Sequence, residues 1–153
     1  MKSLELKAPP LPFAAAMGAL MWAIDWWLPL QSSRTPGRTV AAVAMFVVAV
    51  AMTSTAVFGF RKARTTVNPM APETASAIVD TGVYRFTRNP MYLGFLLALI
   101  AWAIFLGNIV SALIPVLFVA YMNRFQIAPE ERALRARFGE PYAAYLRSVR
   151  RWI

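Results

Sequence analysis

Long apolar runs constrain this chain more than any other feature. Leu11–Leu30 contains Asp25 as its only charged residue, and Thr39–Phe60 contains none. A helix that crosses about 30 Å of hydrocarbon at 1.5 Å per residue needs about 20 mostly apolar residues. The chain is 59% hydrophobic with a mean hydropathy of +0.51, which is more apolar than a soluble domain. These runs predict an integral membrane protein whose first two spans lie within residues 11–60.

A third apolar block, Met91–Met122, is too long for one spanning helix. The Gly107-Asn108 pair divides it, which predicts a helical hairpin with arms Met91–Leu106 and Ile109–Gln126. Pro115 should bend the second arm. The fold class expected is therefore all-α and integral to the membrane, as one domain over residues 1–153. It has about four transmembrane helices, a cytoplasmic loop and C-terminal amphipathic helices.

The basic residues predict the orientation of these spans. The chain has 16 Lys and Arg against 7 Asp and Glu, a net charge of +9. Four spans place all the Lys and Arg residues except Arg34 and Arg38 on one side of the membrane, together with both termini. Because cytoplasmic loops are enriched in Lys and Arg, we expect both termini in the cytoplasm and the chain in a bacterial inner (cytoplasmic) membrane. The membrane thus explains the charge, and nucleic acid is not an expected partner.

The connections between the apolar runs carry their own signals. The loop Arg61–Pro90 is expected to hold a short helix at Glu73–Val79. Pro129 suits the first position of a C-terminal helix, Gly139 suits its cap, and Pro141 restarts the chain in a second helix. Both pieces combine arginine with apolar positions, which is typical of helices that lie along an anionic leaflet.

Two absent residue types exclude whole chemistries. The sequence has no cysteine and no histidine, which removes disulfides, thiolate zinc sites, His-metal sites and His-dependent triads. No metal is therefore expected. Catalysis must use Asp, Glu, Tyr, Lys, Arg, backbone groups or a borrowed cofactor. Asp25 is a functional candidate because it is acidic within a span, but its position among tryptophans favours an interfacial role.

Polar residues gather at the two ends of the predicted hairpin, in residues 82–92 and 123–132. A hairpin brings its ends together, so we expect convergence at the cytoplasmic face of Arg88, Asn89, Tyr92, Arg124, Gln126, Glu130 and Glu131. Such a pocket offers cations for a carboxylate, carboxylates for an amine or a ribose, and aromatic rings for a flat ring. The same residues are also compatible with membrane-edge anchors and helix caps.

The order of these motifs carries a specific resemblance. The motifs, in chain order, are Tyr84-Arg85, Arg88-Asn89-Pro90-Met91-Tyr92-Leu93-Gly94, Asn108, Glu130-Glu131, Phe138-Gly139, Tyr142 and Tyr145. Over residues 65–153 the chain resembles the core of the isoprenylcysteine carboxyl methyltransferase superfamily, which has short bacterial members and phospholipid methyltransferases among its relatives. The two helices before this core match only in being apolar.

The resemblance implies S-adenosylmethionine as methyl donor, bound where the hairpin and the tail close over it. The cofactor-binding residues it implies are Tyr84, Arg88, Asn89, Pro90, Tyr92, Gly94, Glu130, Glu131 and Tyr142. Phe138 and Tyr145 would pack around the cofactor. One residue departs from the family pattern: Asn89 stands where the family usually has His, so a proton transfer that depends on this His is excluded.

Methyl transfer suits such a chain, because the sulfonium methyl is already activated and needs only alignment and exclusion of water. A carboxylate acceptor needs no base, and Arg124 or Arg85 is placed to orient it. An amine acceptor must lose a proton, for which Glu130, Glu131 or a tyrosine is the candidate; a thiol acceptor is also open. The function expected is methylation of a lipophilic, membrane-associated or lipid-modified acceptor by direct in-line transfer. The alternative is a non-catalytic scaffold or lipid-binding subunit.

Overall fold

The computed structural model describes residues 5–30 and 35–153. The helical elements are α1 (Pro10–Trp27), α2 (Pro36–Lys62), η2 (Pro72–Thr74), η3 (Gly82–Arg85), α3 (Pro90–Leu106), η4 (Ser111–Leu113), α4 (Ile114–Tyr121), the π-helix η5 (Met122–Ile127), α5 (Ala128–Phe138) and α6 (Glu140–Ser148). The described residues form no β-strand, so the all-helical prediction is confirmed. Lys2 and Arg34, which entered the charge argument, lie outside the described ranges.

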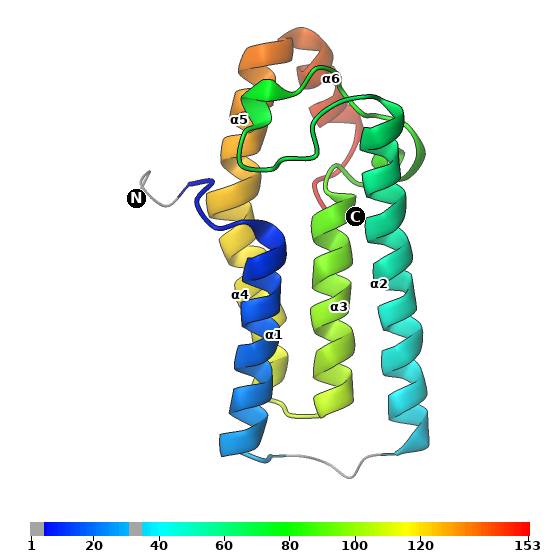
Figure 1. The fold of residues 1–153 in the computed structure, drawn as a ribbon, viewed down its shortest axis with the longest axis vertical. Helices are drawn as coiled ribbons and strands as arrows, with labels where there is room; N and C mark the ends of the chain where they lie inside the picture. The colour runs from blue at the N-terminus through cyan, green and yellow to red at the C-terminus, as the bar shows by residue number, and fades with distance from the viewer. Residues whose placement is uncertain (1–4, 31–34) are drawn as a thin grey trace.

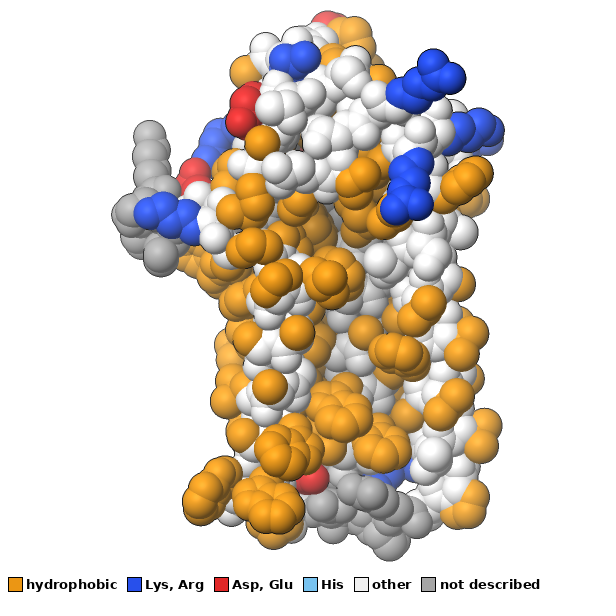
Figure 2. All heavy atoms as spheres, viewed as in Figure 1, with side chains coloured by type: hydrophobic (Ala, Val, Ile, Leu, Met, Phe, Trp, Pro, Cys, Tyr) orange, Lys and Arg blue, Asp and Glu red, His pale blue; other side chains and the backbone are white. Residues whose placement is uncertain are grey.

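Four helices, α1 to α4, stand side by side with α3 in contact with the other three (Figure 1). Residues 5–9, residues 63–89, α6 and the C-terminal residues gather at one end of the bundle. Two described segments have the length and composition to cross a membrane, Pro36–Lys62 and Ser111–Phe138. On the face seen in Figure 2, apolar side chains cover the length of the helical bundle, and charged side chains gather mostly at the end that holds α6.

The closest packing in the bundle is between α2 and α3. Ala42, Ala49 and Ala56 recur every seven residues on α2 and are buried. Opposite them lies Gly94 of α3, where a Cβ atom would fall on the Thr53 hydroxyl and 2.9 Å from the carbonyl oxygen of Ala49. Small residues let helix backbones approach in this way within a membrane. The α2–α3 contact therefore fixes the position of the first turn of α3, which carries polar residues.

The predicted hairpin is confirmed in its turn and corrected in its second arm. Gly107 ends α3 in the left-handed conformation, with φ 68°, which glycine adopts without strain. Pro129 lies in the first turn of α5, as predicted, but the second arm does not end at Gln126, because η4, α4, η5 and α5 follow one another without a gap from Ser111 to Phe138. Pro129 lacks the N–H that would bond to the carbonyl of Phe125, and the Leu6 N–H donates to that carbonyl instead at 3.0 Å.

Three smaller expectations concern prolines and caps. Pro115 lies in the first turn of α4, where proline is tolerated. At this position it does not force the bend that was expected. The expected helix at Glu73–Val79 is wrong: after the short η2 turn, the chain extends and Ser76 N–H donates to Thr65 Oγ1 at 2.9 Å. Gly139, with φ 62°, ends α5 as predicted and α6 begins at the next residue.

Asp25 lies at the end of the bundle opposite to the termini. Trp22, Trp26 and Trp27 around it are exposed, as in an interfacial belt. The Asp25 side chain itself is buried, and its Oδ1 accepts a hydrogen bond from Asn108 Nδ2 at 3.2 Å. Asn108 also donates to the carbonyl of Leu28 at 2.7 Å. The side chain ties α1 to the α3–η4 turn, and its interfacial position stays a prediction.

Candidate functional site

A small cavity opens where the polar ends of the hairpin meet. Its volume is about 100 Å³. Four parts of the chain line it: the end of α2, the loop after it, the η3–α3 junction and the α5–α6 region. The lining residues are Phe60, Thr66, Val67, Asn68, Pro69, Pro72, Ala75, Tyr84, Arg88, Asn89, Pro90, Met91, Tyr92, Glu130, Glu131, Leu134 and Tyr142. Aromatic, amide and carboxylate groups therefore face one space.

Glu130 is the centre of one hydrogen-bonded group at this cavity. Tyr92 Oη donates to Glu130 Oε1 at 2.5 Å, and Gln126 Nε2 donates to the same oxygen at 2.7 Å. Gln126 also donates to the carbonyl of Pro69 at 2.9 Å. Gln126 and Glu130 are four residues apart, so they share one face of the helix that η5 and α5 form. The carboxylate is thus held by neutral donors, and no ion pair to it is present among the described residues.

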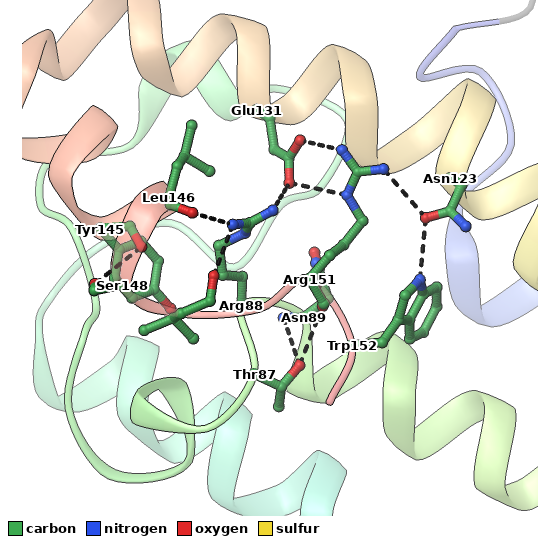
Figure 3. A network of polar contacts seen from close by, with 11 residues as sticks. Thr87, Arg88, Asn89, Asn123, Glu131, Tyr145, Leu146, Ser148, Arg151 and Trp152 are labelled. Carbon is green, nitrogen blue, oxygen red and sulfur yellow. Dashed lines mark hydrogen bonds and ion pairs between the residues drawn. The ribbon is translucent and has the colours of Figure 1, made fainter.

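Glu131 belongs to a second, charged group, drawn in Figure 3. Arg88 Nη2 lies 2.9 Å from Glu131 Oε1, and Arg151 Nη2 lies 2.5 Å from Oε2. Arg88 Nη1 donates to the backbone carbonyls of Leu146 and Val149, both at 2.7 Å. Arg88 therefore links α3, α5 and the end of α6, and its side chain is only 12% exposed.

The last residues of the chain bind to the turn that precedes α3 (Figure 3). Arg88 N–H donates to the carbonyl of Arg150 at 3.0 Å. Thr87 Oγ1 and Asn89 Nδ2 donate to the carbonyl of Arg151 at 3.2 and 2.9 Å. Asn89, the departure from the family pattern, thus holds the tail with a bond that needs no titrating group.

One buried donor at the cavity has no hydrogen-bond partner among the described residues. Arg88 Nε is buried and unbonded, whereas both terminal nitrogens of the same guanidinium are used. Buried polar groups are almost always bonded, and an exception calls for an explanation such as a missing ligand. Because Arg88 lines the cavity, its Nε is a place for an acceptor oxygen of a ligand.

Two tyrosines of the cavity remain neutral over the physiological pH range. Burial raises the pKa of Tyr84 well above its usual value, and the neighbouring Tyr145 and Glu130 raise it further. Burial raises the pKa of Tyr142 in the same direction, with a smaller contribution from Glu131. Both hydroxyls are therefore hydrogen-bond donors and not bases at neutral pH.

The structure brings together most of the site residues expected from the sequence. Those that line the cavity are Tyr84, Arg88, Asn89, Pro90, Tyr92, Glu130, Glu131 and Tyr142. The other residues named from the sequence do not line it: Arg85, Gly94, Arg124, Gln126, Phe138 and Tyr145. Arg124 points away and pairs with Glu5 at 3.0 Å, and Gly94 packs against α2. The geometry gives Arg124 no part in orienting an acceptor at this cavity.

Other residues of the site had no role assigned from the sequence. Gln126 stood only among the converging polar residues, although its four-residue spacing from Glu130 places both on one helix face. The loop residues from Thr66 to Pro72 and the contacts of Arg151 carry no motif. Only the tertiary structure places them at the cavity and the tail.

Comparisons with known proteins relate the chain to a family of methyltransferases. Residues 37–141 match the family described as Phospholipid methyltransferase. An uncharacterized protein of Haemophilus influenzae is 46% identical over 63 residues, which are 41% of this chain and all of that protein. Protein-S-isoprenylcysteine O-methyltransferase of Schizosaccharomyces pombe is 33% identical over 72 residues, 47% of this chain and 30% of the yeast enzyme. No solved structure matches the chain.

Proposed function

Because the chain belongs to the phospholipid methyltransferase family, we propose that it uses S-adenosylmethionine to methylate a lipophilic acceptor in the membrane. The observation that carries the proposal is the cavity, which carboxylates and aromatic rings line together with Arg88, whose buried Nε has no partner among residues 5–30 and 35–153. A zwitterionic cofactor with a flat base needs these groups: a donor for its carboxylate, an acceptor for its amine or ribose, and apolar walls.

The residues present fit this cofactor. Arg88 Nε would donate to the cofactor carboxylate, and Glu130 would accept from an amine or hydroxyl in place of one of its present donors. Tyr84 and Tyr142 would pack against the base. When bound, the cofactor supplies a methyl group activated by the sulfonium. The protein aligns the two reactants and excludes water.

Glu130 is the carboxylate of this site that has a proton-accepting role open to it. Glu131 is neutralised by two arginines, whereas the partners of Glu130 are a tyrosine hydroxyl and an amide. An amine acceptor must lose a proton, and Glu130 would take it. A carboxylate or thiolate acceptor would leave Glu130 to hold the cofactor alone. The class of acceptor stays open among these three.

A separate groove supports a lipophilic acceptor. It has a volume of about 640 Å³ and is lined by apolar residues of α1, α2 and α3. These include Leu11 and Trp22 of α1 and Phe95 of α3. The ring of Phe95 lies 6.5 Å from the ring of Tyr92, between their centroids. The groove therefore ends one helical turn from the cavity, at a place where a hydrocarbon chain would bring its head group toward Tyr92.

The proposal includes the position in the membrane. The four helices α1 to α4 would each cross the bilayer, with the cavity, the tail and both termini on the cytoplasmic side of a bacterial inner membrane. The basic residues at that end support this orientation, since Lys and Arg are enriched in cytoplasmic loops. The cofactor would then enter from the cytosol and the acceptor from the lipid.

Calorimetric titration with S-adenosylmethionine and with its demethylated product tests the proposal. We expect micromolar binding in lipid nanodiscs that is lost in Glu130→Gln. The matched control is Glu140→Gln, because Glu140 is an exposed glutamate of α6 that pairs with Arg147 away from the cavity. Absence of binding in nanodiscs and in detergent would reject the enzyme and favour the non-catalytic scaffold.

A further inference from the structure

Gln126 is a buried amide that bonds in two directions at once. Its side chain is only 1% exposed. Nε2 donates to Glu130 Oε1 at 2.7 Å on its own helix and to the carbonyl of Pro69 at 2.9 Å on the loop that covers the cavity. It also lies 3.5 Å from Tyr92 Oη. Both amide hydrogens are therefore used, one on the carboxylate and one on the loop.

The loop that Gln126 reaches is closed at its base. Thr65 Oγ1 accepts hydrogen bonds from the N–H groups of Ser76 and Ala77 at 2.9 and 3.3 Å, and Ser76 Oγ donates to the carbonyl of Arg64 at 3.1 Å. The ten residues between, 66–75, form what we call the cover loop. Six of them line the cavity: Thr66, Val67, Asn68, Pro69, Pro72 and Ala75.

Few side chains from outside hold the cover loop. Near its base, Arg137 donates to the carbonyl of Ala75. Near its middle, Gln126 donates to the carbonyl of Pro69. The turn at Asn68 is internal, since its Oδ1 accepts from the N–H of Met70 at 3.0 Å. Among the described residues, the middle of the loop is thus fastened by one side-chain hydrogen bond from outside, beside the packing of Pro72 in η2 against α5.

The cavity beneath the loop is too small for a nucleoside cofactor. Its volume is about 100 Å³, whereas sites for small molecules and cofactors usually have about 300–1,000 Å³. The other walls are helix ends and the η3–α3 junction, whereas the cover loop is irregular apart from η2, so we expect the cover loop to be the wall that moves. Its displacement requires that the Gln126–Pro69 bond breaks.

We propose that Gln126 is a positioning residue that holds the cover loop closed over Glu130 and sets how readily a methyl donor enters. This inference rests on the proposed function for the identity of the ligand. The link to Glu130 makes the two roles of Gln126 one device: the same amide that fastens the loop also aims the carboxylate at the ligand space. Loss of the amide removes both hydrogen bonds, so that the cover loop and the Glu130 carboxylate are both released.

Gln126→Met keeps the size of the side chain and removes both donors. The matched control is Asn123→Leu, because Asn123 is an amide on the same π-helix that bonds Trp152 in the tail at 3.0 Å and does not line the cavity. Hydrogen exchange of the backbone amides in residues 66–75 is measured in the ligand-free proteins. We expect exchange about tenfold faster in Gln126→Met and unchanged in Asn123→Leu, from the usual contribution of one hydrogen bond.

The association rate of S-adenosylmethionine, followed by stopped flow, is the second measurement. Since entry needs the open loop, a larger open fraction raises the apparent association rate, by about tenfold for the same bond. A merely structural role would lower the unfolding temperature and leave this rate unchanged. Gln126→Leu, which also lacks both donors but has a different shape, should behave like Gln126→Met and guards against a misfolded variant.

The outcomes separate this inference from the proposed function. Unchanged exchange of residues 66–75 in both Gln126 variants overturns the inference, whatever binds. Faster exchange with an unchanged association rate also overturns it, because the loop would then not control entry. If the wild-type protein binds no donor, the proposed function fails, and the exchange data alone decide whether Gln126 fastens the loop.

Discussion

Arg88 carries three connections with one planar group. It reaches two backbone carbonyls at the end of α6 and one oxygen of Glu131. A lysine ammonium cannot make these bonds together, because it lacks the fork of the guanidinium. We expect Arg88→Lys to lower the free energy of unfolding by about 2–4 kcal/mol, since it leaves buried acceptors unpaired. Denaturant unfolding in detergent, followed by the helical signal, measures this.

The control for Arg88 is a cation of the same kind at the surface. Arg147 pairs with Glu140 at 2.5 Å, but both side chains are mostly exposed. Exposed ion pairs contribute little to the free energy of unfolding, so Arg147→Lys should leave the unfolding midpoint unchanged. Equal effects of the two substitutions would show that Arg88 is an ordinary surface cation and not the link between tail and site.

Residue types at the site were predictable from the sequence, but directions of side chains were not. The hairpin brings Arg88, Tyr92 and Glu130 together because topology alone joins its ends. Arg124 also lies at an end of the hairpin in the sequence, but its side chain turns outward and pairs with Glu5. That contact depends on where residues 5–9 cross the helix, and no local pattern in the sequence encodes this crossing.

At the scale of the element, the α2–α3 contact sets where the site begins. Gly94→Ala would place a methyl group against the Thr53 hydroxyl and 2.9 Å from the carbonyl of Ala49. Overpacking of this kind costs about 1–3 kcal/mol. We expect a lower unfolding midpoint and weaker donor binding, because the first turn of α3 carries Tyr92. Thermal unfolding and calorimetry on the same sample measure both.

Two further variants test the cause of this effect. Thr53→Ala in the Gly94→Ala background should restore part of the stability, since it removes one of the two obstructing groups. Gly37→Ala, on a glycine of α2 with open space around it, should change neither stability nor binding. A Gly94→Ala protein as stable as the wild type would contradict the close approach of α2 and α3.

The ends of the helices, like the directions of the side chains, were only partly predictable from the sequence. Gly107 and Gly139 end helices as predicted, because both adopt positive φ angles that glycine accepts without strain. Pro129 lies in the first turn of α5, as predicted, but the π-helix η5 runs directly into α5, so that no break precedes it. The carbonyl that it leaves unbonded is satisfied by Leu6, a residue more than a hundred positions away. Continuity of the helix thus depends on a long-range contact.

At the scale of the whole molecule, charge and apolar length predict how the bundle lies in a membrane. The absence of cysteine from the sequence makes this testable without background. Ser148→Cys places a thiol at the end of α6, and Thr35→Cys places one before α2, at the opposite end of the bundle. Both native side chains are exposed. If the basic end faces the cytoplasm, a membrane-impermeant maleimide should label Thr35→Cys in intact spheroplasts and Ser148→Cys only after permeabilisation.

The reverse pattern would move the cavity to the outer face, away from cytosolic S-adenosylmethionine, and the proposed function would fail with it. Labelling of both positions before permeabilisation would mean that the bundle does not separate the two sides. Each variant therefore also needs donor binding equal to that of the wild type. With that binding intact, the labelling pattern reports the orientation of the folded protein, and the cavity, the tail and the basic end are assigned to one side together.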